Sequence, residues 1–126
     1  MSFYCEVLNS KFSMSKDNAE KAVLCLQARC WSDVNDYQLK QSTDIYNVLL
    51  EFMWSVEIEN GNVTGIDFNG SKFCNEFYKM FDVIALYVDS GSFIEMASDT
   101  HDFWRYRFKD GKLFLDEGKI VFHEEE

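Results

Sequence analysis

Two dipeptides, Asn60–Gly61 and Asp110–Gly111, constrain the fold of this chain more than any other feature of its sequence. Each follows a run in which apolar and polar residues alternate, and Asn-Gly or Asp-Gly in that position is typical of a tight β-hairpin turn. The first dipeptide joins predicted strands over residues 54–59 and 63–68, and the second ends a predicted strand over residues 103–109. The chain is therefore expected to contain two antiparallel hairpins.

Apolar residues recur at helical spacing in three other segments, each after a Ser or Thr that can cap a helix. We expect helices over residues 16–30, 43–52 and 72–87. Residues 31–41 are polar and show no periodicity, so a loop is expected there. The predicted capping residues are Ser15, Thr43 and Ser71.

Further strands are predicted over residues 2–12, 92–97, 112–116 and 119–122. A chain of 126 residues has the usual length of one domain. Antiparallel hairpins joined by helices are typical of the α+β class. We therefore predict a single α+β domain over residues 1–126, with one curved antiparallel meander sheet of about five to six strands and three helices packed on one of its faces.

The chain is strongly acidic, with 22 Asp and Glu residues against 12 Lys and Arg and a formal net charge of -10. This charge argues against a general nucleic-acid binder, because phosphate contacts need clustered Lys and Arg. The acids are concentrated in residues 41–71 and 80–104, and each of these windows holds five acidic residues and no Lys or Arg. The surplus in the two windows equals the whole net charge.

Strand alternation predicts on which side of the sheet these acids lie. If the apolar residues of each strand face the helices, the acidic residues of the same strands face outward. Arg105, Arg107 and Lys109 point to the same side by the same alternation. Two interpretations are open: a solvated sheet face on which opposite charges pair across strands, or an uncompensated negative surface for a basic partner. The outward acids on strands are Glu57, Glu59, Asp67 and Glu95.

Acidic loop residues and aromatic residues extend the predicted surface. Four aromatic residues, Tyr46 and Phe103 among them, lie outside the apolar stripes of the predicted core. Exposed Trp and Tyr beside acids are typical interface anchors, and the alternative is that these rings cover helix ends. The predicted partner-binding residues are Glu57, Glu59, Asp67, Glu95, Asp99, Asp102, Asp33, Asp36, Trp31 and Tyr37.

No group of residues has the spacing of a metal site or a catalytic motif. The cysteines lack the paired spacing of zinc ligands, and we expect four free, mostly buried thiols. No HExxH, GxSxG or P-loop sequence occurs. His101 lies between acids and could bind a metal or act as a base, but in a turn we interpret it as a polar loop residue. We expect no metal, no cofactor and no enzymatic activity. The cysteines are Cys5, Cys25, Cys30 and Cys74.

Residues 87–96 read YVDSGSFIEM and are followed by FWRYRFKDGK at residues 103–112. This pattern resembles the C-terminal half of a loose class of small acidic bacterial and phage proteins, and the hairpin at residues 61–68 followed by a helix is similar too. The resemblance implies a prokaryotic or phage origin and carries over no catalytic residue. Small acidic proteins from that setting often neutralise a nuclease, a toxin or a defence complex.

The leading hypothesis is a non-enzymatic inhibitor that binds and masks a basic, nucleic-acid-binding surface of a larger protein. A phage anti-defence protein of the anti-CRISPR kind and a toxin-immunity protein both fit, and such a protein would act as a nucleic-acid mimic without binding nucleic acid itself. The alternative is a small regulatory or ligand-binding domain whose acidity serves only solubility.

No membrane partner and no membrane-spanning helix are expected, because no run of ~18 apolar residues occurs. The N-terminus lacks the basic start and apolar run of a signal peptide, so we expect the protein in the cytoplasm of the cell that makes it, or of the host if a phage encodes it. The strand predicted at residues 119–122 could be a free edge that pairs with a second copy in a homodimer.

Overall fold

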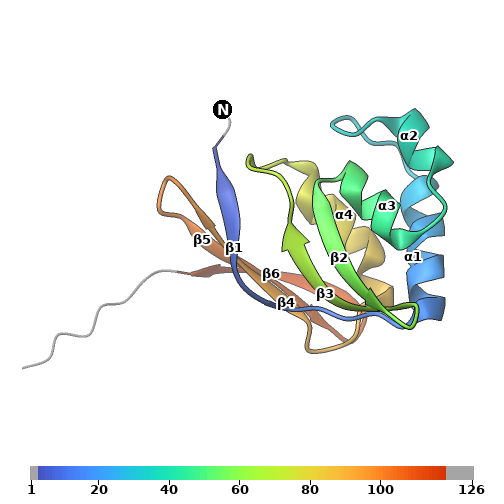
Figure 1. The fold of residues 1–126 in the computed structure, drawn as a ribbon. Coiled ribbons are helices and arrows are strands. Elements are labelled where there is room, and N and C mark those ends of the chain that lie inside the picture. Colours follow the sequence, from blue (N-terminus) through green and yellow to red (C-terminus); the bar gives the residue numbers. More distant parts are fainter. Residues whose placement is uncertain (1–2, 119–126) are drawn as a thin grey trace, which may run out of the picture.

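A computed structural model describes residues 3–118 and confirms the α+β class (Figure 1). Over these residues the chain forms six strands, four α-helices and one 3-10 helix, so one helix more than predicted. The strand predicted at residues 119–122 lies outside the described residues. None of the described helices is long and apolar enough to cross a membrane. The elements are β1 (Cys5–Lys11), α1 (Lys16–Gln27), α2 (Asp36–Gln41), α3 (Ile45–Glu51), β2 (Trp54–Glu59), β3 (Asn62–Phe68), α4 (Glu76–Ile84), η1 (Ala85–Tyr87), β4 (Phe93–Ser98), β5 (Phe103–Lys109) and β6 (Lys112–Gly118).

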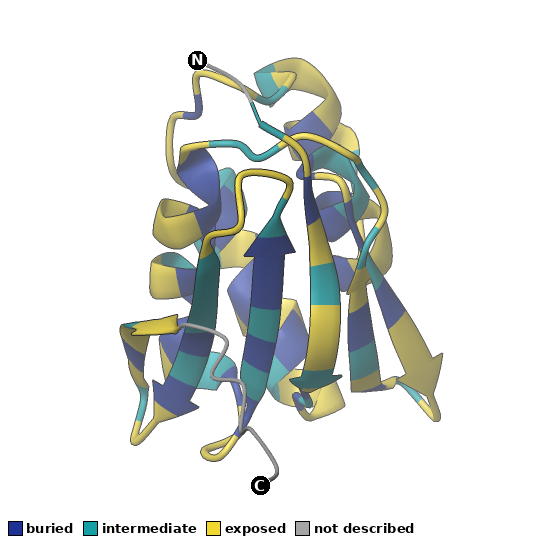
Figure 2. Ribbon diagram, turned by 90° about the vertical axis from the view of Figure 1, so that its left-hand side faces the viewer, coloured by how far each residue is buried: buried dark blue, intermediate teal, exposed yellow. Residues whose placement is uncertain are grey.

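The strands form two antiparallel sheets, a four-stranded one in the order β1-β4-β5-β6 and a two-stranded ribbon of β2 and β3. The prediction of one meander sheet was therefore wrong. The strands are divided between two sheets, and β1 pairs with β4, although the two strands are far apart in the sequence. Figure 2 shows the strands side by side with the helices behind them, so the helices do cover one face as predicted.

The two sheets are joined through β1, but only near its ends. At one end the Cys5 amide donates at 2.9 Å to the carbonyl of Ser71, in the segment that follows β3. Beyond the other end Met14 and Val63 of β3 exchange two backbone hydrogen bonds. Between these points the Ser10 hydroxyl donates to the Ile66 carbonyl at 3.2 Å, so a side chain takes the place of a backbone donor. The pairing of β1 with β4 has a register shift between Val7 and Asn9, which is typical of a β-bulge.

Both predicted hairpin turns are confirmed. Asn60 and Gly61 have φ angles of 54° and 83°, and Asp110 and Gly111 have 52° and 78°. Two successive positive φ angles define the type I′ turn, which Asn, Asp and Gly tolerate best. These turns place β2 against β3 and β5 against β6.

The helix starts were predicted less well. Ser15 does cap α1, since its side chain accepts from the Asn18 amide, but Asp44 and not Thr43 caps α3. A short helix, α2, replaces part of the predicted loop and is capped by Asn35. Apolar periodicity could not reveal α2, because it spans six residues and buries only Leu39.

The third predicted helix starts late for a reason remote in the sequence. The segment around Lys72 is extended and forms an isolated bridge with Tyr4, and the Phe73 amide donates to the Phe3 carbonyl at 2.8 Å. This pairing with the N-terminal segment takes the first residues of the apolar stripe out of the helix. Ser71 therefore caps nothing, and α4 begins at Glu76.

Phe81 of α4 is the point where the two sheets meet in the core. The centroid of its buried ring lies 5.0 Å from that of Trp54 in β2. The same centroid lies 4.8 Å from that of Tyr106 and 5.9 Å from that of Phe108, both in β5. All three pairs are tilted or edge-to-face, the arrangement that aromatic quadrupoles favour. One side chain thus packs against the ribbon and against the four-stranded sheet together.

We predict that Phe81→Ala lowers the free energy of unfolding by about 3–5 kcal/mol, because it leaves a cavity between the two sheets. Urea unfolding followed by tryptophan fluorescence measures this loss, and Phe81→Leu should show a smaller one. Leu86→Ala is the matched control, since Leu86 is 68% exposed and its loss should stay within about 0.5 kcal/mol. A loss below about 1 kcal/mol for Phe81→Ala would contradict the role given to this ring.

Candidate functional site

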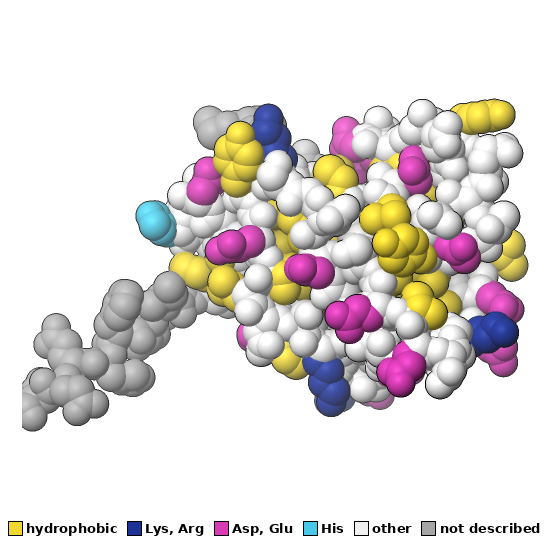
Figure 3. Space-filling model, in the orientation of Figure 1, with side chains coloured by type: hydrophobic (Ala, Val, Ile, Leu, Met, Phe, Trp, Pro, Cys, Tyr) yellow, Lys and Arg dark blue, Asp and Glu magenta, His cyan; other side chains and the backbone are white. Residues whose placement is uncertain are grey.

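The acid-only window at residues 41–71 folds as one continuous unit, α3-β2-β3. On its two strands Glu57, Glu59 and Asp67 are exposed, and we call these three residues the acidic ribbon. Figure 3 shows this side of the molecule, where carboxylates are spread over the ribbon and the neighbouring helices and Lys and Arg are few. The structure therefore gathers three of the predicted partner-binding residues on one element.

The strand register arranges the acids of the ribbon. Glu57 lies opposite Gly65, and Ser55 lies opposite Asp67, so Glu57 and Asp67 are diagonal and not directly opposite neighbours. This diagonal placement lessens the repulsion that like charges suffer in directly opposite positions. The Glu57 side chain lies against Gly65, where an added Cβ would be 2.8 Å from a carboxylate oxygen of Glu57.

No ion pair neutralises the acidic ribbon within residues 3–118, because the ion pairs found there all lie on other elements. Asp67 accepts a hydrogen bond from the Phe68 amide at 2.9 Å. This bond holds the carboxylate in place but does not neutralise its charge. The three carboxylates thus form an uncompensated negative surface on a short, well-anchored hairpin.

The face formed by β4, β5 and β6 is different, because its acids are paired. Guanidinium nitrogens of Arg105 lie 3.6 Å from a carboxylate oxygen of Glu95 and 3.2 Å from one of Asp116. A guanidinium nitrogen of Arg107 lies 2.9 Å from the same oxygen of Asp116. Arg105 and Arg107 are thus on the side of the acids, as predicted. Glu95 is the one predicted partner-binding strand residue that belongs to this compensated network.

Hydrogen bonds from Arg107, with a smaller contribution from Arg105, hold the pKa of Asp116 below its ordinary value of 3.8. A carboxyl whose pKa is lowered by folding adds stability above its unfolded pKa, and this stability is lost as the pH falls through the folded pKa. The ion pair therefore supports the sheet at neutral pH and stops doing so in acid.

We predict that Arg107→Gln raises the pKa of Asp116, measured by NMR titration of its carboxyl carbon. As the pH falls below about 4, the stability of the variant should fall less steeply than that of the wild type. Lys109→Gln is the control, because Lys109 is exposed on the same strand and forms none of the ion pairs. An Asp116 titration that is unchanged in Arg107→Gln would show that the hydrogen bonds do not set this pKa.

Asp99 and Asp102 lie in the turn between β4 and β5 and stabilise it. A carboxylate oxygen of Asp99 accepts from the Tyr4 amide at 3.3 Å, and one of Asp102 accepts from the Thr100 hydroxyl at 3.0 Å. Both residues are exposed, as is His101 between them. They are on a different element from the acidic ribbon, so the second acid-only window does not form one unit as the first does.

Trp31 was expected to be an exposed anchor, and this was wrong because only 7% of it is exposed. Its indole nitrogen donates to the Leu26 carbonyl at 2.8 Å. Its ring packs edge-to-face with that of Phe52, with 4.8 Å between the ring centroids. The ring thus covers the C-terminal end of α1, which was the alternative interpretation.

The other residues predicted near Trp31 remain at the surface. Tyr37 is 69% exposed on α2. Asp36 forms an ion pair with Lys40 at 2.9 Å within the same helix, and Asp33 is exposed in the loop before it. The three residues lie on α2 or in the loop just before it, and Figure 1 shows α2 at one end of the molecule.

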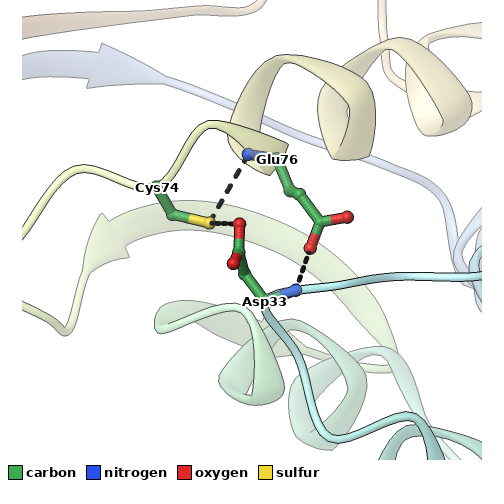
Figure 4. A group of neighbouring side chains, drawn as sticks. All are labelled: Asp33, Cys74 and Glu76. Atoms are coloured by element: carbon green, nitrogen blue, oxygen red, sulfur yellow. Dashed lines mark hydrogen bonds between the residues drawn. The ribbon is translucent and has the colours of Figure 1, made fainter.

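Glu76, which sequence reasoning did not single out, fastens the loop before α2 to α4 (Figure 4). Its carboxylate is buried and accepts from the amides of Ser32 at 2.9 Å and Asp33 at 2.6 Å. Cys74 lies beside it, with its sulfur 3.5 Å from a carboxylate oxygen of Asp33. The partners of Glu76 lie 44 and 43 residues away in the sequence, so no local pattern signals this role.

Potential metal-ligand atoms lie within 4.8 Å of one another in a cluster of three side chains, Asp33, Cys74 and Glu76. Both oxygens of Glu76 are already engaged by backbone amides, and burial raises the pKa of the Cys74 thiol. In this arrangement the cluster connects the loop before α2 to α4.

Burial also raises the pKa of Cys5 to about 11, so this thiol is protonated and weakly nucleophilic at neutral pH.

Comparison with known proteins gives no match: no family model, no curated protein and no solved structure is significantly similar to this chain. Function is therefore inferred from the residues and their arrangement.

Proposed function

We propose that this protein is a non-enzymatic inhibitor that binds and masks a basic surface of a larger protein, in the manner of a phage anti-defence protein or a toxin-immunity protein. The masked surface would be one that binds nucleic acid, because such surfaces are lined with Lys and Arg. The observation that carries the proposal is the acidic ribbon, three exposed carboxylates on one hairpin without an ion pair in the described chain.

The ribbon is a firm support for these charges. Trp54, Val56 and Ile66 point from the same two strands into the core and are buried. The outward carboxylates are therefore spaced by a packed sheet and need little ordering when they meet a partner. Preorganised charge of this kind lowers the entropic cost of association.

The overall charge favours the same function. A net charge of -10 on a chain of this size produces a long-range field that repels nucleic acid and attracts basic proteins. Such steering raises association rates by about 10- to 1000-fold at low salt and less at physiological salt. An inhibitor that must reach its target before nucleic acid does gains directly from this effect.

We predict that E57K/E59K slows association with the partner by about tenfold at low ionic strength, with little change in thermal stability. Asp67 is left intact because its carboxylate bonds to the backbone. The matched control is D82K/E117K, which changes the net charge equally at exposed positions of α4 and β6.

The three proteins are immobilised, incubated with lysate of the cells that produce the protein, and the captured proteins are identified by mass spectrometry. A basic protein retained by the wild type and the control, lost by E57K/E59K and displaced by duplex DNA supports the proposal. Equal capture by all three proteins, or capture that excess DNA does not affect, contradicts it.

A second candidate function is a small ligand-binding or regulatory domain whose acidity serves solubility. One observation favours it: a groove of about 590 Å³ lies between α1 and the start of α3. A ligand that binds only the native state raises the melting temperature, so a thermal-shift screen of metabolites tests this candidate. Shifts abolished by substitutions in the groove would support it.

A further inference from the structure

The groove beside the acidic ribbon is lined mainly by apolar side chains. Its base consists of Ala19 and Val23 of α1 and Ile45 of α3, all of them buried. Leu24 and Ile58 stand at its edges and are 67% and 44% exposed. Exposed apolar side chains at the edges of a hollow with an apolar base are typical of a binding surface.

Ile58 is open to solvent although it lies on the helix side of the ribbon. It pairs with Val63, which is buried, and it follows Val56 with the normal alternation of β2. The helices leave its side chain uncovered, so it forms part of the groove. Tyr46, on the first turn of α3, is half-exposed on the same groove.

Hydrogen bonds at both ends hold the groove in shape. At one end the Lys16 amide donates to the Asn62 side chain at 2.9 Å, and the Lys16 side chain packs over Gly61. At the other end the Gln27 side-chain amide donates to the carbonyls of Leu39 at 3.0 Å and Ser42 at 2.7 Å. The hollow is therefore formed before any ligand arrives.

The charges around the groove specify what fits it. Glu20 and Asp44 line it, whereas Glu57 and Glu59, on either side of Ile58 in β2, point to the opposite face of the ribbon. Lys16 is the one cation among its lining residues in the described chain. A second copy of this chain, with a net charge of -10, is repelled from such a rim, whereas a cationic segment is attracted.

We infer that this groove receives an amphipathic helical segment of the basic partner, with large apolar side chains on one face and Lys or Arg beside them. The groove is lined by side chains of helices and a strand tip, so it anchors side chains spaced along one helical face and does not extend a sheet. The inference rests on the proposed function, because it assigns the same basic partner to a second, adjacent part of the surface.

The test uses the intact protein and three fluorescein-labelled 15-residue peptides. One has Leu at helical spacing on one face and Lys on the other, the second has Glu in place of Lys, and the third has Ser in place of Leu. Binding is measured by fluorescence anisotropy and located by methyl chemical-shift changes in NMR. The variants are L24Q/I58T in the groove, E57K/E59K on the ribbon, and L86Q as a control at an exposed position of η1.

The Leu/Lys peptide should bind best, shift the methyl signals of Val23 and Ile45, and lose about tenfold or more in affinity with L24Q/I58T but not with L86Q. If L24Q/I58T binds this peptide as well as the wild type does, the groove assignment is overturned. The proposed function survives that result when E57K/E59K still weakens capture of the basic partner. Two other results also overturn the groove assignment. One is tighter binding of the Leu/Glu peptide than of the Leu/Lys peptide. The other is a wild-type dimer in analytical ultracentrifugation that L24Q/I58T converts to monomer.

Discussion

The contact of α4 with both sheets holds this molecule together where its strands separate. β1 is bonded along its length to β4, whereas the hydrogen bonds to the ribbon come from Ser10 and, just beyond the strand, from Met14. Backbone pairing alone therefore leaves the ribbon weakly attached. The ring of Phe81 fills that junction and packs against aromatic side chains from β2 and β5. Because the ribbon carries the exposed acids on its other face, this packing also fixes where those charges are displayed.

The two acid-only windows of the sequence have different outcomes for a simple topological reason. The first folds into α3, β2 and β3, which are neighbours in space and contain no Lys or Arg to pair with. The second contributes β4 to a sheet whose adjacent strand supplies Arg105 and Arg107, and Glu95 is paired with Arg105 as a result. Within the described residues, the predicted outward acids are therefore in an ion pair on the four-stranded sheet and without ion pairs on the ribbon.

Local signals predicted much of the fold and of the acidic surface. The hairpin turns followed from the positive φ angles that Asn, Asp and Gly tolerate, and the outward direction of Glu57, Glu59 and Arg105 followed from strand alternation. Long-range pairing was not predictable in this way. The bridge between Tyr4 and Lys72 delayed the start of α4, and the contact with Phe52 buried Trp31. Residues remote in the sequence decided both outcomes.

The electrostatic potential at the surface of each sheet is the most direct test of an uncompensated acidic ribbon. It can be measured by NMR from the relaxation of backbone amide protons by matched cationic and anionic paramagnetic cosolutes. The cationic cosolute should be strongly preferred near Glu57 and Asp67, and much less so near Arg105 and Arg107 of β5. An equal preference at both sheets would contradict this view, because the surplus charge would then be spread evenly over the protein.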